Sequence, residues 1–184
     1  PTGRGTQLHS LSPTEREDVL HWLHDVSDRI AIKTTEAPQY RRVALQRKQP
    51  DYAYSGGDLY QQLTTQTHKL LGEVPVKPRR PRPPMAVNSG SGFAFIDHIG
   101  DVYPSGFLPL HCGNVTDTSF ADIYEHSPVF QNLRDPDHWE GKCSVCEFHT
   151  VCGGSRSTAY AMTGNYRASD PTCSYVPPAW KKSS

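Results

Sequence analysis

Four of the five cysteines lie in the last third of this 184-residue chain, and their spacing carries the clearest chemistry. Cys143, Cys146 and Cys152 form a C-x2-C-x5-C pattern that runs directly into two glycines, and Cys173 follows beyond a short predicted helix. Thiolates are soft ligands that select zinc or iron–sulfur clusters. Four of them suit either a structural zinc ion or a [4Fe–4S] cluster, and spacing alone does not distinguish the two.

The arrangement of the cysteines favours iron–sulfur binding, because zinc sites often pair two C-x2-C knuckles and only one is present here. A zinc site that adds His149 to Cys143, Cys146 and Cys152 is an alternative, as are four unligated thiols. The odd count and tight grouping argue against a disulfide framework and indicate a reducing compartment, so we expect a cytoplasmic protein. Cys112 stands apart as a further candidate ligand, a substrate-facing thiol or a small buried hydrophobe.

Short elements must hold these cysteines in place. The sequence predicts a hairpin over residues 93–105, because apolar residues flank a glycine turn there. Serine and proline start signals predict two short helices over residues 119–126 and 128–134. A run of small residues predicts a helix over residues 154–163 that ends at Gly164.

The sequence pattern of the N-terminal part predicts three helices and a strand. A capping-box pattern beginning at Ser12 opens a helix that reaches residue 29. A β-type run follows over residues 30–35, and a helix that feeds a short buried strand is what α/β barrels repeat. Two more helices are expected over residues 39–48 and 58–71.

The charge balance excludes some classes of partner. The chain has 19 Lys and Arg against 19 Asp and Glu, so its formal net charge is zero. This balance removes the general electrostatic argument for nucleic acid or an acidic membrane. No apolar run approaches the ~18 residues that a membrane-spanning helix needs. We therefore expect neither nucleic-acid nor membrane binding. Five prolines and four basic residues over 75–84 predict an extended linker.

Several stretches of the sequence, in the same order along the chain, resemble those of one family. They are HCGNV at 111–115, SFADIYEHSPVFQNLRD, GKCSVCEFHTVCGGSRSTAYAMTGN and DPTCSY. The region from about residue 90 to 178 resembles the auxiliary-cluster domain of radical S-adenosylmethionine (SAM) enzymes, of the SPASM type or its shortened twitch relative. It is most similar to the branch with haem and haem d1 maturases. The resemblance implies one auxiliary [4Fe–4S] cluster, held by Cys143, Cys146, Cys152 and Cys173, with Cys112 as an additional candidate.

The first residues resemble the last third of the partial TIM barrel that carries the radical chemistry. This match rests on PTGRG, the first helix and IAIKTTEAP. It implies that Arg4, Thr34, Thr35 and Glu36 contact SAM or substrate, with local capping or surface packing as the alternative. The expected fold class is α+β, with the end of a partial TIM-like barrel in residues 1–49, a helical insertion and Pro/Arg-rich linker in 50–85, and a SPASM/twitch-like domain of hairpin plus helices in 86–184.

The family holds its radical cluster with a CxxxCxxC motif, and this chain has none. We therefore expect it to be the C-terminal part of a longer radical SAM oxidoreductase or maturase, unable to cleave SAM by itself. The resemblance implies a tetrapyrrole-like or peptide substrate, a ferredoxin or flavodoxin as electron donor, and electron relay or substrate positioning for the auxiliary cluster. The alternatives are a non-catalytic interaction module that binds zinc through four cysteines and a ferredoxin-like electron carrier.

Overall fold

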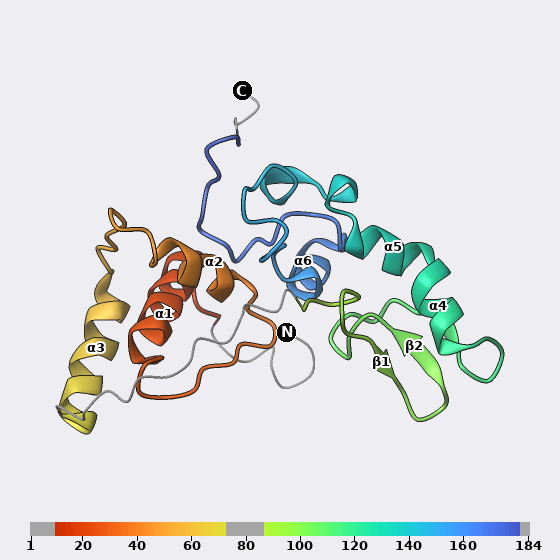
Figure 1. Cartoon of the computed structure of the whole chain (residues 1–184), viewed down its shortest axis with the longest axis horizontal. Helices are drawn as coiled ribbons and strands as arrows, with labels where there is room; N and C mark the ends of the chain where they lie inside the picture. The colour runs from red at the N-terminus through yellow and green to blue at the C-terminus, as the bar shows by residue number, and fades with distance from the viewer. Residues whose placement is uncertain (1–9, 73–86, 181–184) are drawn as a thin grey trace. The chain divides into compact units, whose positions relative to one another are not determined.

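The computed structural model describes residues 10–72 and 87–180 (Figure 1). Helices and one small antiparallel sheet make up its regular structure, which is compatible with the expected α+β class. The linker predicted over residues 75–84 and the candidate residue Arg4 lie outside the described residues. Among the helices that are described, none combines the length and apolar character needed to span a bilayer.

The chain divides into two compact units. The first consists of Pro1–Pro84 together with Thr172–Ser174. The second consists of Met85–Pro171 and Tyr175–Ser184. A short segment around Cys173 therefore belongs to the N-terminal unit, although it follows most of the second unit in the sequence.

Three helices build the first unit: α1 (Pro13–Val26), α2 (Gln39–Gln46) and α3 (Asp58–Leu71). The predicted capping box opens α1. The Ser12 hydroxyl accepts the Glu15 N–H at 3.2 Å, and the Glu15 carboxylate accepts the Ser12 N–H at 2.8 Å. Two N–H groups that the helix itself cannot satisfy are paired in this way. The predictions of these three helices are confirmed, with ends that differ by a few residues.

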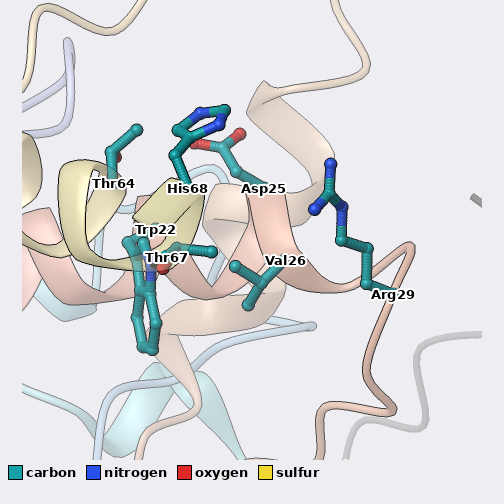
Figure 2. Close-up of a pocket in the computed structure, with 7 residues that line it drawn as sticks. All are labelled: Trp22, Asp25, Val26, Arg29, Thr64, Thr67 and His68. Carbon is teal, nitrogen blue, oxygen red and sulfur yellow. Dashed lines mark hydrogen bonds between the residues drawn. The ribbon is translucent and has the colours of Figure 1, made fainter. Parts of the chain in front are cut away.

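Helix α1 packs against both other helices. The apolar side chains of Leu20, Val26 and Val43 are buried in this unit. The indole N–H of Trp22 donates to the Thr67 hydroxyl at 2.8 Å, which ties α1 to α3 in the groove of Figure 2. Helices α1 and α2 thus supply the buried apolar side chains, whereas α3 buries no side chain of its own.

Much of what the first unit buries is polar. The guanidinium of Arg42, 1 % exposed, donates to both carboxylate oxygens of Glu17 at 2.8 and 2.6 Å. Such paired charge-assisted hydrogen bonds are among the strong ones, and here they join α1 to α2. His21 is fully buried and stacks on Tyr54 with ring centroids 3.6 Å apart. The Tyr54 hydroxyl donates to Asp18 at 2.6 Å.

The strand predicted over residues 30–35 is wrong. Residues 31–34 have no regular secondary structure, and residues 35 and 36 form a bend. A strand requires a hydrogen-bonded neighbour, and all the strands among the described residues belong to the other unit. The apolar and β-branched residues of this run therefore have no ladder to join. The partial barrel expected for residues 1–49 stays a prediction.

The second unit contains a three-stranded antiparallel sheet in the order β1–β2–β3. In its register Phe95 lies opposite Tyr103, and Asp101 lies opposite Asn114. The predicted hairpin is confirmed. Its turn contains Gly100 with a φ of 91°, a conformation that favours glycine. The strands are β1 (Phe95–Ile96), β2 (Asp101–Tyr103) and β3 (Gly113–Asn114).

Short helices follow the sheet (Figure 1) and confirm the predicted positions. Ser119 begins the first of them by accepting the Asp122 N–H at 3.1 Å, and Gly164 ends the last with a φ of 74°. The elements are α4 (Phe120–His126), α5 (Pro128–Arg134), the 3-10 turns η2 (Pro136–His138) and η3 (Gly141–Cys143), and α6 (Arg156–Thr163).

The apolar core of this unit is small. Val102 of the sheet, Ile123 of α4 and Phe130 of α5 form one buried cluster. Gly113 allows α4 to approach the sheet, because a Cβ there would lie 3.1 Å from the Ile123 side chain. Its φ of 146° also favours glycine.

Candidate iron–sulfur site

Three of the four candidate ligands lie on one compact turn of the second unit. Cys143 is the last residue of η3 and, like Cys152, is 8 % exposed, while Cys146 is half-buried. The chain between them folds back on itself. The Cys152 N–H donates to the Phe148 carbonyl at 2.8 Å, and the His149 N–H donates to the Cys146 carbonyl at 3.0 Å. The C-x2-C-x5-C segment is therefore held by its own backbone.

The two glycines after Cys152 bring two of the sulfurs to the same piece of backbone. Gly153 and Gly154 have φ values of 65° and 66°. The Gly154 N–H donates to Cys152 Sγ at 3.4 Å, and a Cβ on Gly154 would lie 3.3 Å from Cys143 Sγ. Glycine is needed here because the backbone is left-handed and the sulfurs approach closely.

Two polar side chains from distant parts of the chain fix this turn. The side-chain amide of Asn88 donates to the carbonyls of Cys152 at 3.2 Å and Gly154 at 2.9 Å. The carboxylate of Asp170, which is fully buried, accepts the Ser155 N–H at 2.8 Å. Sequence reasoning did not single out either residue. Their only sequence signals are an Asn–Ser–Gly turn and an Asp–Pro pair, which are common in loops.

Arg156, at the start of α6, is a fully buried cation beside the turn. Its guanidinium donates to Cys143 Sγ at 3.7 Å. It also donates to the carbonyls of Tyr166 at 3.0 Å and Ala168 at 2.8 Å, and it lies over the Trp139 ring, 5.1 Å from its centroid. This residue too was missed from the sequence, where it has the pattern of an ordinary helix residue.

The chemistry of the donor set suits an iron–sulfur cluster, because soft thiolates are its usual ligands. Thiol sulfurs with N–H donors directed at them match the environment in which cluster potentials are tuned. Within residues 10–72 and 87–180, however, no three His, Cys, Asp or Glu side chains are gathered so that they could hold a metal ion. The ligand set therefore stays a prediction.

Cys173 belongs to the first unit and is half-buried there. Its neighbour Ser174 donates to Glu17 at 3.2 Å. Membership of Cys173 in the ligand set rests on the sequence pattern. The alternative zinc ligand His149 has its Nδ1 atom 2.6 Å from the Cys146 carbonyl, so that this ring nitrogen is engaged with the local backbone.

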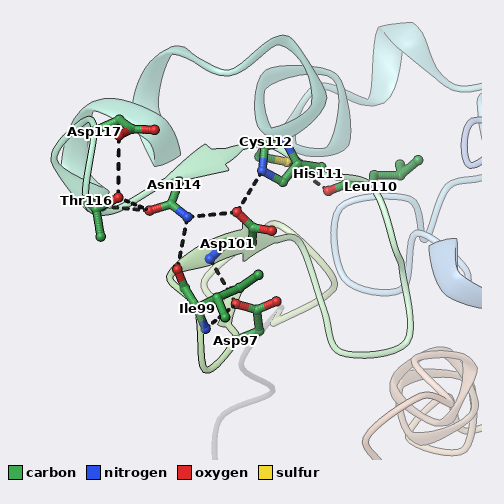
Figure 3. A network of polar contacts seen from close by, with 9 residues as sticks. All are labelled: Asp97, Ile99, Asp101, Leu110, His111, Cys112, Asn114, Thr116 and Asp117. Carbon is green, nitrogen blue, oxygen red and sulfur yellow. Dashed lines mark hydrogen bonds and ion pairs between the residues drawn. The ribbon is translucent and has the colours of Figure 1, made fainter.

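Cys112 has the surroundings of a packed thiol. It packs against the cluster of Val102, Ile123 and Phe130, and its Sγ donates to the Leu110 carbonyl at 3.2 Å (Figure 3). Burial raises the pKa of this thiol. Ligands must be thiolates, so these surroundings favour the small buried hydrophobe over the additional ligand.

The HCGN stretch that contains Cys112 has a structural task, visible in Figure 3. The Asn114 amide donates to Asp101 at 2.8 Å and to the Ile99 carbonyl at 3.1 Å, which joins β3 to the hairpin turn. His111 lies 3.1 Å from the same Asp101 oxygen. Hydrogen bonds from Asn114 and His111 hold the pKa of Asp101 below its usual value.

Three of the residues predicted to contact SAM or substrate are described in the structure, and their role stays a prediction. Thr34, Thr35 and Glu36 lie in the irregular segment after α1, with Thr35 exposed and the other two half-buried. Two grooves of the first unit, of about 140 and 510 Å³, have other linings. The smaller lies between α1 and α3 (Figure 2) and is lined by Trp22, Asp25, Val26, Arg29, Thr64, Thr67 and His68.

The first part of the cysteine-bearing turn, with Cys143 and Cys146, lies in a stretch that matches a known family. The SPASM family, an iron–sulfur cluster-binding domain, matches residues 88–147. The AdoMet-dependent heme synthase of Methanosarcina barkeri is 35 % identical over 179 residues, which cover 96 % of this chain and 46 % of that protein. The protein of the same name from Nitratidesulfovibrio vulgaris is 37 % identical over 181 residues, covering 96 % of this chain and 44 % of its own length.

A third relative is similar over a shorter stretch. The PqqA peptide cyclase of Gluconobacter oxydans is 36 % identical over 109 residues, covering 53 % of this chain and 28 % of the cyclase. The chain thus spans less than half the length of the curated relatives it matches. These similarities show that residues 88–147 match the SPASM iron–sulfur cluster-binding domain and that the chain as a whole is similar to the AdoMet-dependent heme synthases.

Proposed function

We propose that this chain is the C-terminal part of a radical SAM maturation enzyme. In this proposal it binds one auxiliary [4Fe–4S] cluster through Cys143, Cys146, Cys152 and Cys173. The match of residues 88–147 to an iron–sulfur cluster-binding domain carries the proposal. The double glycine, the two buried thiols and the N–H donors at their sulfurs support it. An auxiliary cluster of this type supplies a one-electron redox centre.

The pattern of relatives favours a tetrapyrrole-like substrate over a peptide for the whole enzyme. The proteins named AdoMet-dependent heme synthase match 96 % of the chain, whereas the PqqA peptide cyclase of Gluconobacter oxydans matches 53 %. The N-terminal unit is therefore shared with the haem branch. In this proposal the residues that contact SAM or substrate are Arg4, Thr34, Thr35 and Glu36. A ferredoxin or flavodoxin supplies the electrons.

The residues of this chain have defined tasks in the proposal. Cys143 and Cys152 lie in a turn that is largely closed to water, because each is 8 % exposed. Asn88 and the two glycines fix the backbone between them. These groups would orient the thiolates and limit the access of water, which are two ways in which a protein tunes an iron–sulfur cluster.

The metal content of the chain, purified without oxygen, tests the proposal. We expect about four iron and four acid-labile sulfide per chain, which is one [4Fe–4S] cluster. About one zinc without sulfide would instead establish a closed structural site. That outcome would overturn the proposal in favour of the zinc-binding interaction module, which the family match does not favour.

A further inference from the structure

Arg156 is buried in a way that demands an explanation. Its side chain is fully buried, and its Nε atom has no hydrogen-bond partner among the described residues. Burying a guanidinium is costly unless its charge and its N–H groups are compensated. The partners of the remaining nitrogens are two carbonyls, an aromatic ring and the sulfur of Cys143. Only the sulfur among these can become an anion.

The neighbouring carboxylate is engaged by the backbone of the turn. Asp170 is also fully buried, and one of its oxygens accepts the Ser155 N–H at 2.8 Å. The Nη2 group of Arg156 faces Cys143 Sγ at 3.7 Å. Because a thiol is a weak acceptor and a thiolate a strong one, this contact strengthens when Cys143 is deprotonated as a ligand.

From this geometry we infer that Arg156 is a positioning residue that sets the reduction potential of the auxiliary cluster through Cys143. The inference rests on the proposed function, because it requires the cluster. Reduction adds one negative charge to a cluster, and a buried guanidinium beside a ligand sulfur stabilises the more negative state. Arg156 thus raises the potential, and it does so at every accessible pH because arginine stays charged.

The same guanidinium also fixes where Cys143 lies. Its hydrogen bonds to Tyr166 and Ala168 anchor it to the loop that follows α6. Its stack on the ring of Trp139 also anchors it to a segment that precedes α6 in the sequence. The charge is therefore held rigidly next to the sulfur, which is the condition for a defined effect on the potential.

A redox titration of the cluster-loaded chain tests the inference. In Arg156→Gln the ratio of reduced to oxidised cluster at a fixed potential should fall at least tenfold, a shift of about 59 mV for a one-electron couple. Arg156→Lys retains the charge and should shift less. Arg134→Gln is the matched control, because Arg134 also stacks on a ring, that of Tyr124, and donates to its carbonyl at 2.7 Å. It should leave the potential unchanged.

Pulsed electron paramagnetic resonance on the unmutated chain gives a second test that requires no variant to fold. With 15N-labelled arginine, the reduced cluster should show coupling to a guanidinium nitrogen. Arg134→Lys should retain this coupling, and Arg156→Lys should lose it. Absence of arginine coupling in the loaded chain would overturn the inference, whether or not Arg156→Gln loads.

The outcomes also separate this inference from the proposed function. A chain that takes up no iron and sulfide overturns both. A chain that carries a full cluster whose potential is the same in Arg156→Gln leaves the proposed function intact and overturns the inference alone.

Discussion

Cys146 and Cys112 are both half-buried thiols, but their surroundings differ. Cys146 lies on the compact turn that also presents Cys143 and Cys152. Cys112 packs against the apolar core and donates to the Leu110 carbonyl. At the scale of single residues, this difference predicts that iron binding requires Cys146 and not Cys112.

We expect Cys146→Ala to lose the iron of the anaerobically loaded chain, and Cys112→Ala to retain nearly all of it. The first change removes a thiolate ligand, whereas the second removes a sulfur that is satisfied by packing. Iron and sulfide analysis of both variants checks this. Equal iron loss in the two variants would mean that Cys112 is a ligand and that a single four-cysteine cluster is wrong.

Glu17 predicts how the first unit responds to acid. Burial opposes its ionisation, but hydrogen bonds from His21 and Arg42 and the charge of Arg42 outweigh it and lower the pKa to about 2 from the usual 4.5. A lowered pKa stabilises the folded state above pH 4.5, and this contribution is lost as the pH falls from 4.5 toward 2. The full contribution is on the order of 3 kcal/mol.

Urea unfolding of the first unit at neutral pH and near pH 3 measures this effect. Glu17→Gln should destabilise the unit at neutral pH and reduce the loss of stability on acidification. Glu125→Gln is the control, because that side chain is exposed and should change little. An acid response that is the same with and without the Glu17 carboxylate would contradict the assignment.

The Cys152–Gly154 turn is the element on which the site depends. Both Gly154 and Gly164 have positive φ, at 66° and 74°. A Cβ on Gly154 would meet Arg156 Nη2 at 2.7 Å, Asp170 Cβ at 2.9 Å and Cys143 Sγ at 3.3 Å, whereas a Cβ on Gly164 would meet nothing within 4 Å. The pair separates the cost of the backbone conformation from the cost of crowding the sulfurs.

Gly154→Ala should therefore abolish or strongly reduce iron loading, because the added methyl group crowds Arg156, Asp170 and Cys143 at the turn. Gly164→Ala should load iron normally and lose about 1–2 kcal/mol of stability from the left-handed backbone alone. Iron content and thermal unfolding of the two variants provide the measurement. Normal loading in Gly154→Ala would show that the close approach at this turn is dispensable.

For the whole molecule, the two units differ in what stabilises them. The first is joined by the Glu17–Arg42 pair and by Trp22 on Thr67. The second buries apolar side chains around Val102, Ile123 and Phe130, and it holds the turn with three of the four proposed ligands. Because metal binding is coupled to folding, the unit that carries most of the ligands gains stability from a bound metal group.

Removing the cluster by oxidation and chelation should accordingly loosen the second unit and leave the first largely unchanged. Amide hydrogen exchange reports on both at once. Protection should fall in β2, α4 and α6 and persist in α1 and α2. Unchanged protection of the second unit after complete iron loss would mean that the cluster has no structural role.

Local sequence signals determined most elements of this chain. The Ser12 capping box, the Pro128 start and the Gly164 stop each act within about one helical turn, so the residues that fix α1, α5 and α6 are neighbours in the sequence. The cysteine spacing and its glycines are equally local. For that reason the sequence alone also indicated the SPASM iron–sulfur domain, which residues 88–147 match.

Tertiary structure decided what depends on distant partners. The run over residues 30–35 has strand-like residues, but no described strand lies beside it in its unit to pair with. Asn88 holds carbonyls 64 and 66 residues away, and Arg156 reaches back 13 residues to Cys143. Hydrogen bonds between distant residues leave no periodicity or spacing in a sequence, because they depend on how the chain folds back on itself. The cysteines were therefore readable from the sequence, and the charge beside them was visible only in the fold.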